Sequence, residues 1–248
     1  EAGLFSTTTK LSGTTKFVVG GADKATEGEA VHFNYDTIID LDTSFTGQDL
    51  LKTSLRAGNF ASTTPWATSG SATLETAYGS GDAVQINRNY YQFPVGESMT
   101  ATVGAVVRQD DMLGVWPSSY PSDSVLDVLT YAGANAAYNL SLGAGAGITY
   151  TNDNISASLL FVSEEATDAS QGVLTEQGSD DLTAQLAWVG DNFTVAAAYT
   201  TSDAGNTTST ADAEDYDAWG ISAQYDLDNG ISLNAGMGWK TPDKENDT

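Results

Sequence analysis

The sequence lacks cysteine altogether and contains a single histidine, His32. A disulfide framework, a thiolate nucleophile and a cysteine-type metal site are therefore excluded, as is a metal site built from several histidines. Basic residues are scarce, because nine lysines and arginines stand against 33 aspartates and glutamates and leave a formal net charge of −24. A surface of this sign repels nucleic-acid phosphates, so we expect no nucleic-acid partner.

Proline is rare too, with five residues, whereas glycine reaches 25 and Ser, Thr, Asn and Asp crowd the gaps between apolar segments. This composition favours many strands joined by turns, hence an all-β fold. The uncharged segment 128–152 is long enough for a membrane helix. Its asparagines, its glycines and the two-residue period of its second half argue against a helix.

Strict two-residue alternation is the dominant pattern, and the segment 182–200, "LTAQLAWVGDNFTVAAAYT", shows it well. Large apolar residues occupy one face of each predicted strand, and small or polar residues occupy the other. In the predicted strand 99–108, for example, Met99, Val103 and Val107 share a face opposite Thr102 and Arg108. Eleven such strands are predicted, at 10–19, 31–42, 51–57, 84–95, 99–108, 140–151, 155–163, 181–189, 193–200, 216–226 and 231–240.

The connections between these strands alternate in length. Short links are predicted at 46–49, 96–98, 152–154, 190–192 and 226–230, and long ones at 20–30, 59–83, 109–139, 164–180 and 201–215. Short turns at one end and long loops at the other are typical of a transmembrane β-barrel. A soluble β-sandwich remains an alternative, since it also alternates, but it gives no reason for the alternating loop lengths. In the barrel, the apolar face meets lipid and the polar face lines a lumen.

Four segments carry a resemblance to a known family: "FSTTTKLSGTTKFVVGG", "LDTSFTGQDLLKTSLRAGNF", "NYYQFPVG" and "GAGAGITYTNDNISASLLF". In order along the chain, they resemble the cyanobacterial outer-membrane porins of the carbohydrate-selective (OprB-type) porin family. The resemblance implies an antiparallel porin-type barrel, no enzymatic activity and no cofactor. It also implies passive diffusion of small hydrophilic solutes (inorganic ions, sugars or iron species) across a Gram-negative outer membrane.

The same resemblance implies a homotrimer in contact with outer-membrane lipid and lipopolysaccharide. Family members carry an N-terminal surface-layer-homology domain and a coiled coil that tether the barrel to peptidoglycan. We expect residues 1–248 to be a partial barrel domain that lacks this N-terminal region and the C-terminal strands. A water-filled barrel of this kind has about 16–18 strands. A plugged or structural barrel that acts as a surface adhesin or phage receptor remains the alternative function.

Charged residues at the lumen-facing phase are the candidate functional residues, because a charge on the lipid face costs about 2–4 kcal/mol at mid-bilayer. The basic candidates are Lys10, Lys16, Lys52, Arg56, Arg88 and Arg108. The acidic candidates are Asp36, Asp40 and Asp42, on one strand, and Asp110, Asp111, Asp123 and Asp127, in the long third loop 109–139. We hypothesise that this loop folds inward and narrows the channel, with its acidic edge facing the basic residues. The alternative is that these are ordinary solvated wall charges.

Glycines 143, 145 and 147 share the lumen-facing phase of one strand. Positions without side chains would let the inward loop pack closely on the wall; a tight interface between protomers is the alternative. Acidic loops are expected to crown the outer side, at Glu164, Glu165, Asp168, Asp180, Asp181, Asp212, Glu214, Asp215 and Asp217. The run 212–217, "DAEDYD", lacks the regular ligand spacing of a calcium loop, and no metal site is predicted. No nucleophile elbow or phosphate loop is present.

Overall fold

The computed structural model of the chain describes residues 8–21, 30–62, 64–68, 73–205 and 215–242. Over these residues it contains eleven strands, a short helix α1 (Pro65–Thr68) and two 3₁₀ turns, η2 (Gln109–Met112) and η3 (Asp127–Leu129). The strands are β1 (Thr9–Gly20), β2 (His32–Thr43), β3 (Leu50–Gly58), β4 (Gln85–Val95), β5 (Met99–Arg108), β6 (Leu142–Asn152), β7 (Ile155–Ser163), β8 (Asp180–Val189), β9 (Phe193–Asp203), β10 (Tyr216–Asp226) and β11 (Ser232–Pro242).

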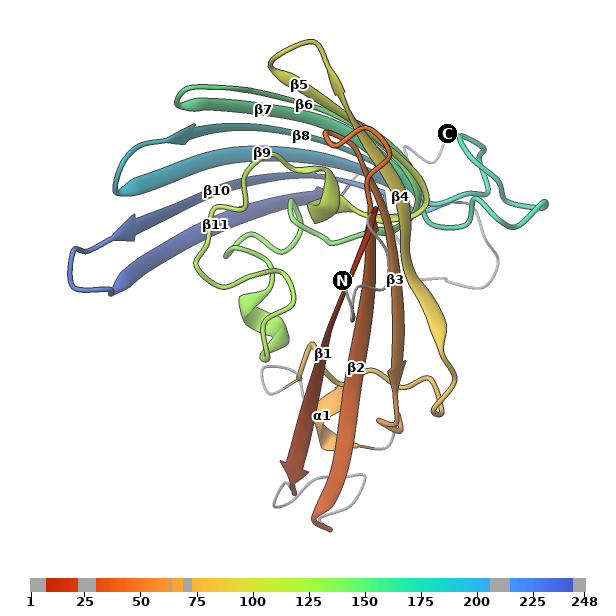
Figure 1. Cartoon of the computed structure of the whole chain (residues 1–248). Coiled ribbons are helices and arrows are strands. Elements are labelled where there is room, and N and C mark those ends of the chain that lie inside the picture. The colour runs from red at the N-terminus through yellow and green to blue at the C-terminus, as the bar shows by residue number, and fades with distance from the viewer. Residues whose placement is uncertain (1–7, 22–29, 63, 69–72, 206–214, 243–248) are drawn as a thin grey trace. The chain divides into compact units, whose positions relative to one another are not determined.

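The strands lie in one sheet in chain order, each beside its neighbours in sequence (Figure 1). The registers are antiparallel, with Leu11 opposite Leu41 in β1–β2 and Trp219 opposite both Tyr199 and Trp239 in β9–β10–β11. The predicted number and order of strands are therefore confirmed, and each end lies within a few residues of the predicted one. Among the described residues, no helix has the length and apolar character required to cross a membrane.

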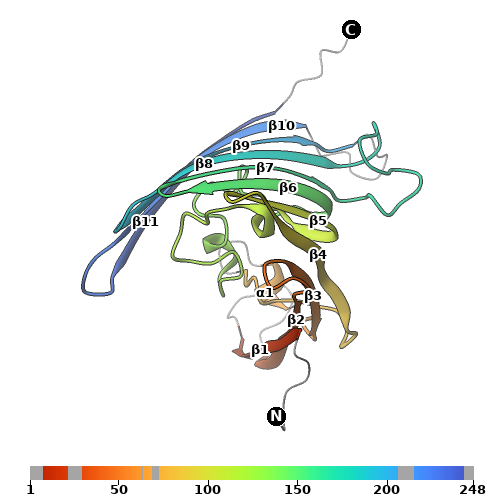
Figure 2. The same cartoon turned by 45° about the horizontal axis from the view of Figure 1, so that its top comes forward.

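The chain divides into two compact units. The N-terminal unit comprises residues 1–91 and 120–130, and the C-terminal unit comprises 92–119 and 131–248. In the C-terminal unit, strands β5 to β11 follow one another side by side (Figure 2). The long connection 109–141 contributes to both units: its segment 120–130 belongs to the N-terminal unit, and its other residues belong to the C-terminal unit.

Burial along the strands is the reverse of that in an ordinary water-soluble sheet protein. In β8 and β9, Leu186 is 60% exposed and Trp188 is 47% exposed, whereas Thr183 and Thr200 are fully buried. The N-terminal unit repeats the pattern, with Phe17 69% exposed and Asp36 1% exposed. We call these the apolar face and the polar face of the sheet. A contiguous exposed apolar surface of this extent marks contact with another apolar phase.

The predicted sheet face is wrong at the end of β5. Val107, predicted on the apolar face, is fully buried, because β5 contains a bulge between Gly104 and Val107. An extra residue in a strand shifts the side-chain alternation by one position. Val107 therefore lies on the polar face, opposite Gly143. The same shift places Arg108 opposite Leu142, in the phase of the apolar face, and not in the lumen-facing phase predicted for it.

The turn between β2 and β3 is organised by one carboxylate. Asp49 Oδ1 accepts hydrogen bonds from the backbone N–H groups of Phe45 (3.0 Å) and Thr46 (2.7 Å), and from the Ser44 hydroxyl (2.8 Å). Its Oδ2 accepts from the Tyr91 hydroxyl (2.7 Å). Burial acts to raise the pKa of Asp49, but the bonds from Thr46, Tyr91 and Ser44 outweigh it and hold the pKa well below its ordinary value.

Acid should therefore weaken this hairpin through Asp49. A pKa that is lower in the folded state gives stability that is complete above the unfolded pKa, near 4, and is lost as pH falls toward the folded pKa. We expect Asp49→Asn to lower the urea midpoint at pH 7 and the difference from the wild type to shrink below about pH 4. The control is Asp228→Asn, at an exposed aspartate in the β10–β11 turn. A midpoint difference that does not change with pH would contradict the assignment.

Candidate functional site: the polar face and the 109–139 loop

The polar face of the N-terminal unit carries a network of paired charges. Lys10 lies opposite Asp42, and Asp42 lies opposite Lys52, so opposite charges alternate in a row across β1, β2 and β3. Lys52 Nζ lies 3.1 Å from Asp42 Oδ1 and 3.3 Å from Asp40 Oδ1. These side chains are only partly buried. The row is thus close to neutral overall and remains accessible to ions.

Arg56 forms a stronger and more deeply buried pair. Its Nε and Nη2 donate to the two carboxylate oxygens of Asp36 at 2.8 and 2.9 Å. Nη2 also donates to the Glu75 carbonyl oxygen (3.2 Å), and the guanidinium lies 4.3 Å from the centre of the Tyr78 ring. Bidentate pairing and ring stacking fix a planar guanidinium in one orientation. The Arg56 charge is therefore held rigidly on the wall.

Further charged candidates of the N-terminal unit are Lys16, Arg88, Asp123 and Asp127. Lys16 Nζ donates to the Asp123 carbonyl oxygen (3.1 Å), so this strand lysine binds the loop through a backbone atom. Arg88 is 8% exposed, and its Nη1 donates to the Asn87 carbonyl oxygen (2.7 Å). Asp127 begins η3.

The loop segment 120–130 pairs with residues 73–75 of the same unit. Leu74 and Leu126 form an antiparallel bridge. The Glu75 N–H donates to the Val125 carbonyl oxygen (3.0 Å), and the Asp127 N–H donates to the Thr73 carbonyl oxygen (3.0 Å). Backbone pairing of this kind holds the segment whatever side chains it carries.

The start of the loop is fixed by charge and by close packing. Arg108 Nε donates to Asp110 Oδ1 (2.6 Å), and Asp111 Oδ2 accepts from the Arg108 N–H (2.9 Å). Met112, 2% exposed, lies over the glycine row of β6. A Cβ added at Gly145 would be 3.2 Å from Met112 Cε, and one at Gly147 would be 3.1 Å from Met112 Sδ. A side chain at either position would thus press on η2.

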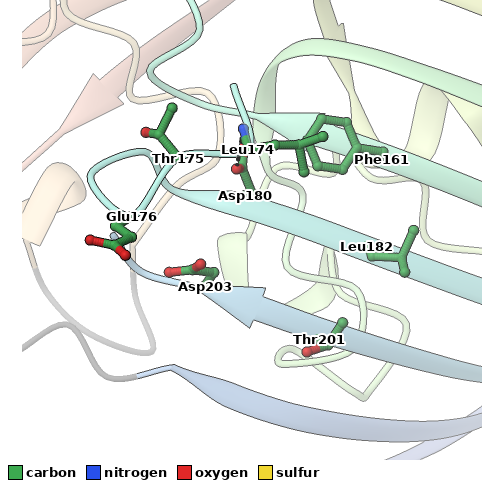
Figure 3. A pocket seen from close by; sticks show the side chains of 8 residues that line it. All are labelled: Phe161, Leu174, Thr175, Glu176, Asp180, Leu182, Thr201 and Asp203. Atoms are coloured by element: carbon green, nitrogen blue, oxygen red, sulfur yellow. Dashed lines mark hydrogen bonds between the residues drawn. The ribbon is translucent and has the colours of Figure 1, made fainter. Parts of the chain in front are cut away.

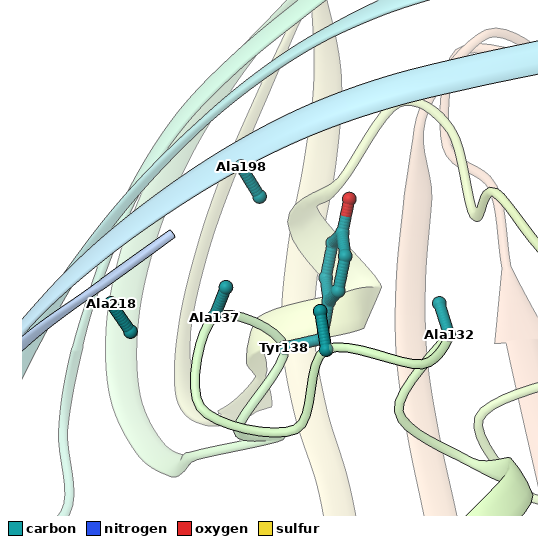
Figure 4. Packing of buried hydrophobic residues seen from close by; sticks show 6 residues of the cluster. Ala132, Ala137, Tyr138, Ala198 and Ala218 are labelled. Atoms are coloured by element: carbon teal, nitrogen blue, oxygen red, sulfur yellow. The ribbon is translucent and has the colours of Figure 1, made fainter. Parts of the chain in front are cut away.

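The segment 131–138 lies against the polar face of strands β9, β10 and β11 (Figure 4). Ala137 and Tyr138 are fully buried with Ala198 and Ala218. Gly133, at φ 77°, touches Gly236 backbone to backbone, since a Cβ on Gly133 would be 2.6 Å from Gly236 Cα. The loop segment can pack this closely because the facing positions of the strands carry only small residues: Ala196, Ala198, Ala218, Gly220, Gly236 and Gly238.

Polar side chains of the wall bind the backbone of this segment. The Ala137 carbonyl oxygen accepts from Gln109 Nε2 (2.9 Å) and from the Thr200 hydroxyl (2.7 Å). The Ala132 carbonyl oxygen accepts from the Ser222 hydroxyl (2.6 Å). Gln109, Thr200 and Ser222 are all at least 99% buried. Buried hydrogen bonds of this kind are costly to break, because a buried polar group then has no partner.

Tyr138 anchors the C-terminal part of the segment. Its ring packs edge-on against Trp116, with centroids 5.3 Å apart, and its hydroxyl accepts a hydrogen bond from Gln185 Nε2 (3.0 Å). Burial raises the pKa of Tyr138 to about 12, although the bond from Gln185 opposes the shift. The phenol therefore stays neutral at any physiological pH.

Sequence reasoning identified part of this arrangement and missed part. The glycines 143, 145 and 147 were expected to accommodate the loop, and Met112 lies beside two of them. Gly220, Gly236 and Gly238 were not singled out, although they share the polar-face phase of β10 and β11. Lys240 was missed too; its Nζ lies 4.0 Å from the centre of the Tyr216 ring, and Asn139 donates to the Tyr216 hydroxyl (3.1 Å). Among the acidic-loop residues, Asp212 and Glu214 lie outside the described residues.

That the acidic edge of the loop 109–139 faces the basic residues of the strands stays a prediction. The structure gives the partners of several of these charged groups. Asp110 and Asp111 bind Arg108 within their own segment, and Asp36 binds Arg56 on the adjacent strand. Acidic and basic groups thus alternate across the wall of the N-terminal unit, whereas in the C-terminal unit Arg108 is paired with the first residues of the loop. A field between the loop and the strands would come in addition to these local pairs.

Comparison with known proteins places the fold. The structure is similar to that of a mutant of the porin of Rhodopseudomonas blastica, with a TM-score of 0.54 and 17% sequence identity. The match covers 94% of this chain and 73% of that porin chain. A loop-deletion mutant of OmpT, an outer membrane protein of Vibrio cholerae, is 7% identical, with a TM-score of 0.52 over 96% of this chain and 72% of that one. The fold is that of the porins. The predicted all-β, antiparallel, porin-type fold is therefore confirmed.

Sequence comparison is less specific. No protein-family model matches the chain. An uncharacterized protein of Synechocystis sp. is 26% identical over 217 residues, which cover 82% of this chain and 39% of that protein. The chain thus spans less than half the length of this relative.

Proposed function

We propose that this protein is an outer-membrane porin, a water-filled channel for passive diffusion of small hydrophilic solutes. The observation that carries the proposal is the reversed burial of the strands, with Leu186, Trp188, Trp219 and Phe17 exposed on one face and Asp36 buried on the other. In water, an apolar surface of this extent would drive association. In a bilayer it is matched by acyl chains, and the charged face lines an aqueous lumen.

The polar face supplies the proposed functional residues. The strand residues of the wall are Lys10, Lys16, Asp36, Asp40, Asp42, Lys52, Arg56 and Arg88. Arg108, which the bulge in β5 takes out of the polar-face phase, instead holds the start of the loop through Asp110 and Asp111. The loop 109–139, with Asp110, Asp111, Asp123 and Asp127, forms the constriction, and Gly143, Gly145 and Gly147 accommodate it. Paired charges on both sides of a narrow lumen orient polar solutes as they pass, much as charged rings set selectivity in other channels.

The finer identity follows the family resemblance. We infer a carbohydrate-selective, OprB-type porin of a cyanobacterial outer membrane, whose solutes are inorganic ions, sugars or iron species. It functions as a homotrimer embedded in outer-membrane lipid and lipopolysaccharide, with peptidoglycan bound through a separate N-terminal domain. Diffusion through such a channel needs no cofactor and no catalysis.

Reconstitution in planar lipid bilayers tests the proposal. We expect the purified protein to give steady open-channel steps whose conductance rises in proportion to salt concentration, because ions cross in water. The control is the same preparation after heat denaturation, which should give no steps. A correctly inserted but electrically silent protein would contradict the channel and favour the alternative, a plugged barrel that serves as an adhesin or phage receptor.

A further inference from the structure

A pocket lies in the C-terminal unit, with its floor on the apolar face and not on the polar face to which the channel function is assigned. It has a volume of about 520 Å³ and is formed where the connection between β7 and β8 meets the ends of β7, β8 and β9 (Figure 3). Pockets that bind small molecules have volumes of about 300–1,000 Å³. Eight residues line it: Phe161, Leu174, Thr175, Glu176, Asp180, Leu182, Thr201 and Asp203.

The lining is divided into an apolar part and an acidic part. Phe161 lies opposite Leu182, and Leu182 lies opposite Thr201, so one row of the apolar face forms the floor. In Figure 3, Glu176 and Asp203 lie toward one end of the pocket, and Phe161 and Leu182 lie toward the other. Leu174, from the connection, is 77% exposed beside them. A ligand that fills the pocket must therefore combine an apolar part with a positively charged or hydrogen-bond-donating group that can bind carboxylates.

The acidic part is not compensated by any lining residue. Asp180 and Asp203 lie directly opposite each other in β8 and β9, and like charges in that position are destabilising. Glu176 adds a third carboxylate. The basic residues in the described part of this unit are Arg108 and Lys240, and neither lines the pocket. A bound cation would remove this repulsion.

Asp180 itself points to a ligand. The residue is 8% exposed, and its Oδ2 accepts a hydrogen bond from the Leu174 N–H (2.8 Å). Its Oδ1 is buried and has no hydrogen-bond partner among the described residues. A buried carboxylate oxygen without a partner is costly, and a charged donor would satisfy it.

We propose that this pocket binds an organic ammonium group attached to a short apolar chain. An ammonium group supplies donors and a positive charge to the opposed carboxylates of Asp180 and Asp203, and the chain covers Phe161 and Leu182. Glu176 adds a further negative charge to the lining. A metal ion is the poorer occupant for two reasons. In the described part of the chain, no three carboxylate or imidazole groups are placed to hold one, and a bare ion would leave the apolar floor unused.

The test is calorimetric titration of the protein in uncharged detergent at pH 7, with hexylammonium as the probe. Hexanol, which lacks the charge, and methylammonium, which lacks the chain, are the matched ligands. We expect hexylammonium to bind measurably and each matched ligand to bind at least about fivefold more weakly, which corresponds to roughly 1 kcal/mol. Equal binding of hexylammonium and hexanol would overturn the proposal, as would no binding of hexylammonium.

Substitutions of the pocket carboxylates test whether hexylammonium binds in this pocket. Asp203→Asn and Glu176→Gln should each weaken hexylammonium binding by about fivefold, the effect of one partly exposed charge pair. Asp191→Asn, an exposed carboxylate at the other end of the β8–β9 hairpin, should leave it unchanged. Equal affinities in all three variants and the wild type would place the probe elsewhere and overturn the assignment. Channel conductance is a separate readout, so failure here is distinguishable from failure of the proposed function.

The ammonium group could belong to a soluble amine or to a lipid headgroup, and vesicles separate these sources. The protein is reconstituted in phosphatidylcholine vesicles with or without phosphatidylethanolamine, whose headgroup ends in a primary ammonium. Weaker apparent hexylammonium binding in the ethanolamine vesicles identifies a lipid occupant. Equal binding in both vesicles identifies a soluble amine. Loss of binding in both vesicles would overturn the site.

Discussion

Gly236→Val is expected to detach the loop segment 131–138 from the wall. A Cβ at this position would clash with the Ala132 carbonyl oxygen and lie 2.8 Å from Gly133 Cα, so the new side chain meets backbone that cannot rotate away. Overpacking of this kind costs about 1–3 kcal/mol. Hydrogen exchange at the Ala137 and Tyr138 amides should accelerate by about fivefold to more than a hundredfold. If the loop narrows the channel, single-channel conductance should also increase.

The matched control is Ala235→Val. Ala235 is the adjacent residue of β11, exposed on the apolar face, where a valine adds the same branched side chain without meeting the loop. We expect exchange and conductance close to those of the wild type. Unchanged exchange in Gly236→Val would show that the segment is not held by close contact with β11. Faster exchange with unchanged conductance would separate loop anchoring from the constriction, and would contradict only the latter.

Arg56→Met is expected to be among the most destabilising single changes on the polar face. Asp36 is 1% exposed, and Arg56 supplies two hydrogen bonds to its carboxylate. Removing one partner of a buried ion pair leaves an uncompensated charge and costs about 3–5 kcal/mol. The double variant Arg56→Met with Asp36→Asn should recover most of that loss, since the buried charge is then gone. Urea unfolding followed by tryptophan fluorescence measures both.

Lys52→Met is the control for this pair. Its partners Asp40 and Asp42 keep 25% and 33% of their side-chain surface exposed, so water can solvate them when the lysine is removed. Partly exposed pairs of this kind contribute about 0–1 kcal/mol. Equal losses in Arg56→Met and Lys52→Met would contradict the distinction drawn between the two pairs, as would a double variant no more stable than Arg56→Met.

The same variants report on selectivity if the face lines a pore. Arg56→Met leaves the Asp36 charge on the wall without its partner, so the reversal potential should shift toward cation selectivity. The double variant restores local neutrality and should return toward the wild-type value. Arg88→Met removes another buried positive charge of the N-terminal unit, and the reversal potential measures its effect in the same way. Unchanged reversal potentials in all of these variants would show that the wall charges do not act on permeating ions.

The fold could be predicted from the sequence because its dominant signal is local. In β8, the alternation of Leu182, Leu186 and Trp188 with Thr183 and Gln185 specifies both the strand and its two faces. The bulge at Gly104–Val107 could not be predicted, because it is an irregularity of pairing between β5 and β6 and leaves the alternating composition of 99–107 intact. The alternation alone therefore predicts the wrong face for Val107.

The candidate site was only partly predictable because it depends on contacts between distant segments. The charged residues of β2 and β3 were visible from their phase, but their pairing, such as Arg56 with Asp36, requires the register of the two strands. Gln109 carried no sequence signal at all; it binds the Ala137 carbonyl oxygen and Thr183 only because the loop returns to the start of η2. The acidic pocket likewise requires Asp180 and Asp203 to be neighbours across two strands.

Main-chain oxygens of the segment 131–138 accept several of the hydrogen bonds that hold it on the wall. The Ala132 and Ala137 carbonyl groups accept the bonds from Ser222, Thr200 and Gln109, and Gly133 meets Gly236 without any side chain between them. Every residue type offers the same carbonyl oxygen. Asn135, whose side chain is exposed, can therefore be exchanged for other residues while these bonds stay in place, so the size and charge at this position can vary without loosening the segment.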